Sequence, residues 1–199
     1  MLGGTFSPPH KGHLEMAKAV LNQFDVDELW FIPCGDPPHK SGQGVWQASH
    51  RLEMTKMLIR NQQNMSVSDI EIKSEGKSYT ALTLTKLKEQ NADTKFYFVV
   101  GADSLCYMDE WKTPEIIFRN AEIILISRKD FSSEKVDNYI EFLEKKYGAV
   151  IHKAVMENVD ISSSFLREEL KMGRDISKYT GKEIYRYILE NMDEFELCY

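Results

Sequence analysis

Short apolar runs alternate with helical patterns along the whole sequence, and this alternation constrains the fold more than any other feature. The runs at residues 96–100 and 123–126 are continuously apolar, which is typical of parallel strands buried on both faces. We expect strands near residues 28–32, 65–72, 96–100, 123–126 and 149–152. We expect helices near residues 14–24, 52–59, 81–87, 133–147, 163–172 and 182–192.

This order predicts βαβ units and an α/β fold, a Rossmann-like doubly wound parallel sheet. We expect a single domain over residues 1–199, with an α/β core at 1–160 and a small C-terminal helical subdomain at 161–199. Ligands of such sheets bind outside the carboxyl ends of the strands. The loops after residues 5, 33, 101 and 127 are therefore predicted to share one rim.

The overall charge restricts the class of partner. The 25 Lys and Arg residues are outnumbered by 31 Asp and Glu residues, giving a formal net charge of −6. An acidic chain lacks the basic surface that nucleic-acid backbones or anionic membranes require, although a local site for a small anion is compatible with it. We expect no nucleic-acid partner and no membrane association, and the sequence leaves a homo-oligomer open.

The cysteines and the apolar runs point to a compartment. The chain has three cysteines, Cys34, Cys106 and Cys198, and their spacing does not suggest pairs. A disulfide framework is therefore not expected. No apolar run approaches the ~18 residues that a membrane span needs, and no signal-peptide pattern opens the chain. The expected location is the cytoplasm.

The first candidate site lies in residues 3–13, which read GGTFSPPHKGH. Paired glycines let a backbone pass close to a phosphate, and the helix that follows presents unpaired N–H groups. His10 and His13 can both donate hydrogen bonds to phosphate oxygens. A plain tight turn with two surface histidines is the simpler explanation of each part, but the whole string favours a phosphate site.

A metal site is the rival interpretation of the same histidines. His39 or Cys34 could complete a zinc ligand set with His10 and His13. However, no Cys-x-x-Cys or His-x-x-x-His pair accompanies them, so we assign no metal-ligating residue.

The second candidate site is the segment ISSSFLR at residues 161–167. Serines at a helix start can cap its free N–H groups, or offer their hydroxyls to a phosphate. Arg167 lies one turn into the helix and can make the forked contact that phosphates favour. Taken alone, the segment is explained as well by capping with a solvent-exposed arginine.

The two segments together resemble the nucleotidylyltransferase superfamily, whose signatures are HxGH and ISSTxxR. Further segments resemble nicotinate-nucleotide adenylyltransferases in particular, in the same order along nearly the whole chain. These segments are Pro37-Pro38-His39-Lys40, Arg51-x-x-Met54, Ser78-Tyr79-Thr80, Gly101-Ala102-Asp103-Ser104, Trp111 and Arg128.

Three positions depart from the family pattern. Ser7 replaces the aspartate of GGTFDP, and Ser164 replaces the usual threonine but keeps a hydroxyl. Only Met1 and Leu2 precede Gly3, where the family has a full strand, and we do not expect two residues to form that strand.

The resemblance implies transfer of the AMP moiety of ATP to nicotinate mononucleotide, giving nicotinate adenine dinucleotide and pyrophosphate in NAD biosynthesis. Mg²⁺ is expected to arrive with ATP and to need few protein ligands. The implied catalytic residues are His13, His10, Lys40 and Arg167. The implied ATP-binding residues are Gly3, Gly4, Thr5, Phe6, His10, His13, Gly101, Asp103, Ser162, Ser163 and Arg167. The implied substrate-binding residues are Lys40, Tyr79, Thr80, Trp111 and Arg128.

Several alternatives remain open at this point. The acceptor could be nicotinamide mononucleotide, phosphopantetheine or another phosphorylated compound, although His10 weighs against phosphopantetheine enzymes. The chain could instead be a non-catalytic nucleotide-binding module on this fold. A fragment of a class I aminoacyl-tRNA synthetase is disfavoured by the chain length, the acidic charge and the lack of a KMSKS-like loop.

Overall fold

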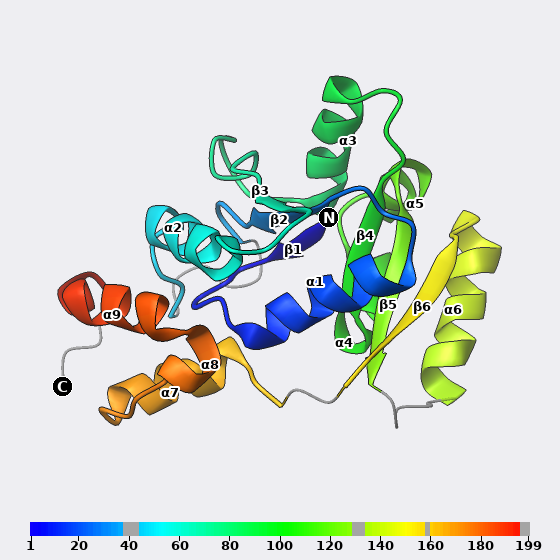
Figure 1. The fold of residues 1–199 in the computed structure, drawn as a ribbon. Coiled ribbons are helices and arrows are strands. Elements are labelled where there is room, and N and C mark those ends of the chain that lie inside the picture. The colour runs from blue at the N-terminus through cyan, green and yellow to red at the C-terminus, as the bar shows by residue number, and fades with distance from the viewer. Residues whose placement is uncertain (38–43, 129–133, 158–159, 196–199) are drawn as a thin grey trace.

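A computed structural model describes residues 1–37, 44–128, 134–157 and 160–195 of the chain. At the centre of these residues is a six-stranded sheet whose neighbouring strands all run parallel. Its strands are β1 (Leu2–Gly4), β2 (Leu29–Pro33), β3 (Met65–Val67), β4 (Tyr97–Gly101), β5 (Glu122–Arg128) and β6 (Ile151–Met156). Their order, β3-β2-β1-β4-β5-β6, is that of a doubly wound Rossmann sheet, so the expected fold class is confirmed (Figure 1).

Helices cover both faces of this sheet (Figure 1). The longer ones are α1 (Lys11–Gln23), α2 (Ala48–Ile59), α3 (Thr80–Gln90), α5 (Pro114–Asn120), α6 (Glu134–Tyr147), α7 (Ser163–Lys171) and α9 (Lys182–Glu190). Short turns of helix are α4 (Ala102–Leu105), η1 (Met108–Glu110), α8 (Ser177–Thr180) and η2 (Met192–Phe195).

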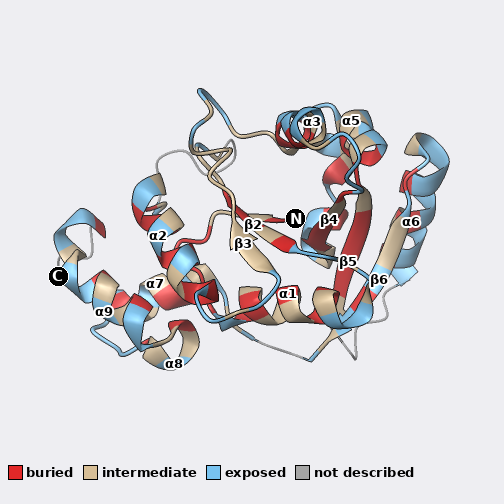
Figure 2. Cartoon of the chain, turned by 45° about the horizontal axis from the view of Figure 1, so that its top comes forward, coloured by how far each residue is buried: buried red, intermediate tan, exposed pale blue. Residues whose placement is uncertain are grey.

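Alternate residues of the central strands face opposite sides of the sheet. Val99 and Ile124 belong to the core beneath α1 and α2, whereas Phe98 and Ile123 belong to the core beneath α3, α5 and α6. Figure 2 accordingly shows the middle of β5 buried and the outward sides of α6 exposed. Burial on both faces explains why these runs are continuously apolar in sequence.

The C-terminal helices form a small lobe that shares the first of these cores. Leu166, Ile184 and Ile188 pack in the same cluster as Leu14 of α1 and Met54 of α2. Helix α8 contacts α1, and α9 contacts α2. This packing brings the ISSSFLR segment, some 150 residues along the chain, to the first turn of α1.

Several expected elements have different bounds. The strand expected at 65–72 ends at Val67, and residues 69–74 form hydrogen-bonded turns instead. As an edge strand with β2 as its neighbour, β3 lacks the second partner that would favour a longer strand. The strand expected at 149–152 is β6, displaced to Ile151–Met156, and α2 begins at Ala48, before the expected residue 52.

A short first strand forms even though only Met1 and Leu2 precede the glycines. The glycines themselves continue the strand, so β1 runs over Leu2–Gly4 and pairs with β2 through all three residues. Leu2 also pairs with Val99 of β4, which makes β1 a central strand. Within the described residues, no helix combines the length and the apolar character needed to cross a membrane.

Candidate active site

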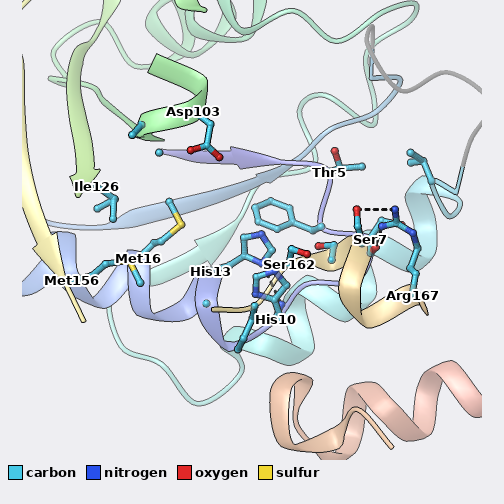
Figure 3. Close-up of a pocket in the computed structure, with 18 of the residues that line it drawn as sticks. Thr5, Ser7, His10, His13, Met16, Asp103, Ile126, Met156, Ser162 and Arg167 are labelled. Carbon is cyan, nitrogen blue, oxygen red and sulfur yellow. Dashed lines mark hydrogen bonds between the residues drawn. The ribbon is translucent and has the colours of Figure 1, made fainter. Parts of the chain in front are cut away.

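A cavity of about 610 Å³ lies at the carboxyl edge of the sheet, where β1 and β4 are neighbours and the winding direction reverses. The turn after β1, the start of α1, the ends of β4 and β5, and the start of α7 all contribute to its walls (Figure 3). Both candidate phosphate segments therefore line one cavity. The predicted rim is confirmed for the loops after residues 5 and 101, whereas residues 129–133 of the loop after residue 127 lie outside the described residues.

His10 and His13 lie together on one side of this cavity (Figure 3). Their rings are stacked, with centroids 3.7 Å apart, and the ring of Phe6 meets His13 edge-on at 4.8 Å. The backbone N–H of His10 donates to Nδ1 of His13 over 3.2 Å. In neutral His13 the proton therefore resides on Nε2, which leaves that nitrogen as a donor.

Both imidazoles are held in the neutral form at neutral pH. Burial lowers the pKa of His10 from 6.5 to about 4. Burial, and secondly the charge of His10, keep the pKa of His13 well below its usual range. Among the described residues, Nδ1 of His10 is buried without a hydrogen-bond partner. A buried polar atom of this kind calls for a ligand or water, and it borders a cavity that can hold one.

The start of α7 is tied to the turn after β1. Ser162 is the N-cap and its hydroxyl accepts the N–H of Phe165, so the capping interpretation of this serine is confirmed. The hydroxyl of Ser163 donates to the carbonyl oxygen of Pro8 over 2.8 Å. These bonds fix the serines beside the histidines without closing the cavity.

Arg167 is half-buried rather than fully solvent-exposed. Its guanidinium donates to the carbonyl oxygen of Ser7 over 2.7 Å and to the hydroxyl of Ser164 over 3.2 Å (Figure 3). Burial lowers the pKa of Arg167, but a guanidinium keeps its charge at any physiological pH. The cavity therefore holds a fixed cation opposite two neutral donors.

The glycines and Phe6 shape the backbone between two cavities. A Cβ on Gly4 would come within 3.0 Å of the Phe6 ring, so a larger residue there would displace it. Phe6 itself is 1% exposed and has a φ of 51°, in the left-handed region. Gly3 and Gly4 line a second cavity rather than the first, whereas Thr5 lines both.

Gly101 and Asp103 also line the first cavity, from the end of β4 and from α4. Asp103 is exposed, and its carboxylate is directed toward the cavity from above β1 in Figure 3.

The second cavity, of about 220 Å³, contains the predicted acceptor residues Tyr79, Thr80 and Trp111. Trp111 packs edge-on against Phe98 with centroids 6.0 Å apart. The ammonium of Lys112 lies 4.4 Å from the centre of the Tyr79 ring. Thr5 joins this cavity to the first, so the two cavities meet at the end of β1.

The structure does not describe the side chains of two predicted site residues, Lys40 and Arg128. Lys40 lies outside the described residues, as does His39. Arg128 is the last residue of β5, at the carboxyl edge of the sheet, and its side chain lies outside the described part of the chain.

The rival metal site is not supported by the placement of Cys34. This residue lines the second cavity, away from the histidine pair. Burial raises the pKa of its thiol to about 11. Among the described residues, no group of three or more His, Cys, Asp or Glu side chains is suited to hold a metal ion.

Sequence reasoning gave no role to Arg51, which holds Thr5, the residue that lines both cavities. Arg51 of α2 is 1% exposed and donates to the carbonyl oxygens of Thr5, Gly35 and Trp46 over 2.8, 3.0 and 2.8 Å. Arg51 comes directly before the helix predicted at residues 52–59, and its place in the segment Arg51-x-x-Met54 was the available signal. A buried guanidinium needs several acceptors, and these carbonyl groups supply them.

Comparison with known proteins agrees with this arrangement. Residues 1–169 match the cytidylyltransferase-like family model. The chain is 38% identical over 192 residues to a probable nicotinate-nucleotide adenylyltransferase of Clostridium botulinum (strain Kyoto / Type A2), covering 96% of each chain. It is 35% identical over 191 residues to one from Lachnoclostridium phytofermentans, again with 96% coverage of both.

Solved structures share the fold. Plasmodium falciparum nicotinic acid mononucleotide adenylyltransferase complexed with NaAD superposes with a TM-score of 0.78 at 24% identity, covering 99% of this chain and 97% of that one. The same enzyme complexed with APC gives a TM-score of 0.78 at 22% identity, with coverages of 99% and 96%. Together with the curated relatives, the cavity lined by both phosphate segments assigns this chain to the cytidylyltransferase-like family, as a member of the nicotinate-nucleotide adenylyltransferases.

Proposed function

We propose that this enzyme transfers the AMP moiety of ATP to nicotinate mononucleotide, forming nicotinate adenine dinucleotide and releasing pyrophosphate. One observation carries the proposal: the two phosphate segments line one cavity, and Thr5 connects it to a second cavity with an aromatic wall. Such a pair of cavities suits two phosphorylated substrates that must react end to end.

The reaction needs no nucleophile from the protein. An ionised phosphate oxygen of the mononucleotide attacks the α-phosphorus of ATP, a new O–P bond forms, and the bond to the bridging oxygen of the β-phosphate breaks. Pyrophosphate leaves with that electron pair. Catalysis then consists of positioning the two phosphates in line and stabilising the charge that develops on the transferring group.

On the ATP side, the proposed roles follow the hydrogen-bonding capacity of each residue. Nε2 of His13 donates to the α-phosphoryl group, and His10 contacts the same phosphates. Arg167, with Ser162 and Ser163 at the start of α7, holds the β- and γ-phosphates. Thr5 and Phe6 form a backbone floor that Gly3 and Gly4 continue beneath the second cavity. Gly101 leaves space beside the nucleotide, and Asp103 accepts from a ribose hydroxyl.

On the acceptor side, Trp111 supplies a flat face on which a pyridine ring stacks. Tyr79, the residue before α3, makes no side-chain capping bond among the described residues, and we propose that the N–H groups of Thr80 and Ala81 bind the nicotinate carboxylate. We further propose that Lys40 and Arg128 contact the mononucleotide phosphate or the bridging region.

Mg²⁺ is proposed to enter with the ATP phosphates rather than on a protein cage. The described part of the chain offers no three-residue cluster of metal ligands, which fits an ion bound mainly by phosphate oxygens and water. When bound, Mg²⁺ neutralises phosphate charge, and Arg167 and the histidines act on the oxygens that remain.

We also propose that residues 1–199 work as one nucleotidylyltransferase domain in the cytoplasm. The free thiols of Cys34 and Cys106 suit a reducing compartment. A homo-oligomer is compatible with this proposal and is not required by it.

The direct test is pyrophosphate release from ATP, Mg²⁺ and nicotinate mononucleotide, with His13→Ala as the matched variant. An enzyme should turn over, and the variant should keep its fold and lose most of the rate. Binding of ATP without turnover would instead identify a non-catalytic nucleotide-binding module.

A further inference from the structure

Glu71 lies in the turn after β3 and lines the second cavity, yet it belongs to neither phosphate segment. Its side chain is half-buried, and its carboxylate accepts the hydroxyl proton of Thr83 over 2.7 Å. Ser78 and Cys34 also hydrogen-bond this carboxylate. Three donors from two separate elements thus converge on one acidic group.

Ser78 connects this group to the loop after β2. Its hydroxyl oxygen accepts the backbone N–H groups of Gly35 and Asp36 over 3.0 and 3.2 Å, which leaves its own proton for Glu71. The backbone N–H of Ser78 donates in return to the carbonyl oxygen of Asp36 over 2.9 Å. The residue before Tyr79 is therefore fastened to the loop that forms the opposite wall.

The main chain of Glu71 is equally constrained. A Cβ on Gly35 would stand 2.4 Å from the carbonyl oxygen of Glu71, so the two backbones are in direct contact. Arg51 donates to the carbonyl oxygen of Gly35 and also interacts electrostatically with the Glu71 carboxylate. Burial raises the pKa of Glu71, while its hydrogen bonds and then Arg51 oppose that rise.

Glu71 therefore fixes the start of α3 through two side chains. Thr83, in the first turn of the helix, and Ser78, the residue before its N-cap, are both bound to the Glu71 carboxylate. The same first turn carries Tyr79 and Thr80 into the cavity. Movement of this turn would shift the helix N–H groups relative to the wall that carries Trp111.

We propose that Glu71 is a positioning residue for the acceptor mononucleotide: its carboxylate holds Ser78 and Thr83, and through them fixes the first turn of α3 against the loop after β2 around the acceptor ring. This inference rests on the proposed function, since it assigns the second cavity to the acceptor. It predicts an effect confined to the acceptor, because none of the bonds of Glu71 reaches the histidine cavity.

The test measures the Kd of nicotinate mononucleotide by calorimetry and the KM of each substrate. Glu71→Ala should raise the Kd and KM for the mononucleotide about tenfold, the scale of one hydrogen bond to a charged group, and leave the KM for ATP within about twofold. Glu71→Gln keeps the volume and one acceptor oxygen, and should give a smaller increase for the same substrate. If Glu71→Ala does not fold, Glu71→Gln carries the test.

A double-mutant cycle with Thr83→Val separates positioning from general destabilisation. Thr83→Val alone should raise the mononucleotide KM about threefold, and adding it to Glu71→Ala should change little further, because the shared bond is already lost. Glu75→Gln is the control, since it removes the same charge from an exposed residue in the same turn region and should leave both KM values unchanged.

The outcomes distinguish this inference from the proposed function. Equal increases in the KM for ATP and for the mononucleotide, additive effects in the cycle, or an effect of Glu75→Gln would overturn the role of Glu71. Mononucleotide binding by the unmutated chain without turnover would overturn the proposed function, while the Kd series would still decide the role of Glu71. Absence of mononucleotide binding would overturn both.

Discussion

The rings of His10 and His13 stack with their centroids 3.7 Å apart and their planes inclined by 27°. The backbone N–H of His10 fixes the tautomer of His13, and a charge on His10 opposes protonation of His13. This pair therefore offers neutral, pre-oriented hydrogen-bond donors to a phosphate, and among the described residues lining the cavity the fixed positive charge is that of Arg167.

Replacing His13 with alanine removes the donor that we assign to the transferring phosphoryl group. The expected result is a fall in kcat of about 10²–10³, with a small change in the KM for ATP, because the interaction strengthens as charge develops. Steady-state kinetics with circular dichroism as a folding control checks this. A variant that retains more than half of the rate would remove His13 from the chemistry.

The lowered pKa of His10 predicts how stability depends on pH. The unfolded chain binds a proton at this residue below pH 6.5, whereas the folded chain does so near pH 4, so stability is full above about pH 6.5 and declines as the pH falls. The shift corresponds to a loss of ~2 kcal/mol at pH 5 relative to pH 7.5. Urea unfolding of the wild type and of His10→Ala measures it as a difference in pH slope. Parallel curves for the two proteins would contradict the buried neutral imidazole.

Replacing Arg167 with lysine keeps the charge and loses the fork that binds Ser7 and Ser164 together. We expect the KM for ATP to rise about tenfold or more, since a point charge cannot reproduce the paired contact with phosphate. The KM for the mononucleotide serves as the internal control and should change much less. An unchanged KM for ATP would assign Arg167 to the structural contact with Ser7 alone.

Gly35→Ala tests the close approach beneath the acceptor cavity. The added methyl group would meet the carbonyl oxygen of Glu71, and we expect a loss of about 1–3 kcal/mol in unfolding free energy together with a higher mononucleotide KM. Gly76→Ala is the comparison, because that position has open space and a φ of 78°, so it should cost only backbone strain, about 1 kcal/mol, and leave the KM unaltered. Equal effects on KM would argue against the contact between residues 35 and 71.

The sheet and the first cavity could be predicted from the sequence because the patterns that indicate them lie within short segments. Continuous apolar runs identified β4 and β5, and HxGH with ISSSFLR identified two segments that meet only after folding. The parallel-sheet rule then predicted the edge at which they meet.

The walls of the second cavity could not be predicted in the same way, because they depend on contacts between residues that are distant in the sequence. Ser78 bonds to Gly35, and Arg51 bonds to Thr5, across tens of residues with no periodic pattern to reveal them. The short elements α4, η1 and α5 were missed for a related reason, since a few residues give too little periodicity to recognise. Strand β3 ends at Val67 because of its tertiary packing, whereas β propensity alone predicted a strand to residue 72.

Direct competition between nicotinate mononucleotide and nicotinamide mononucleotide, with ATP and Mg²⁺ present and both dinucleotide products quantified, tests the central claim most directly. A helix N-terminus facing a carboxylate predicts that nicotinate adenine dinucleotide is the main product. Preferential formation of the amide dinucleotide, or no dinucleotide from the acid, would contradict the account.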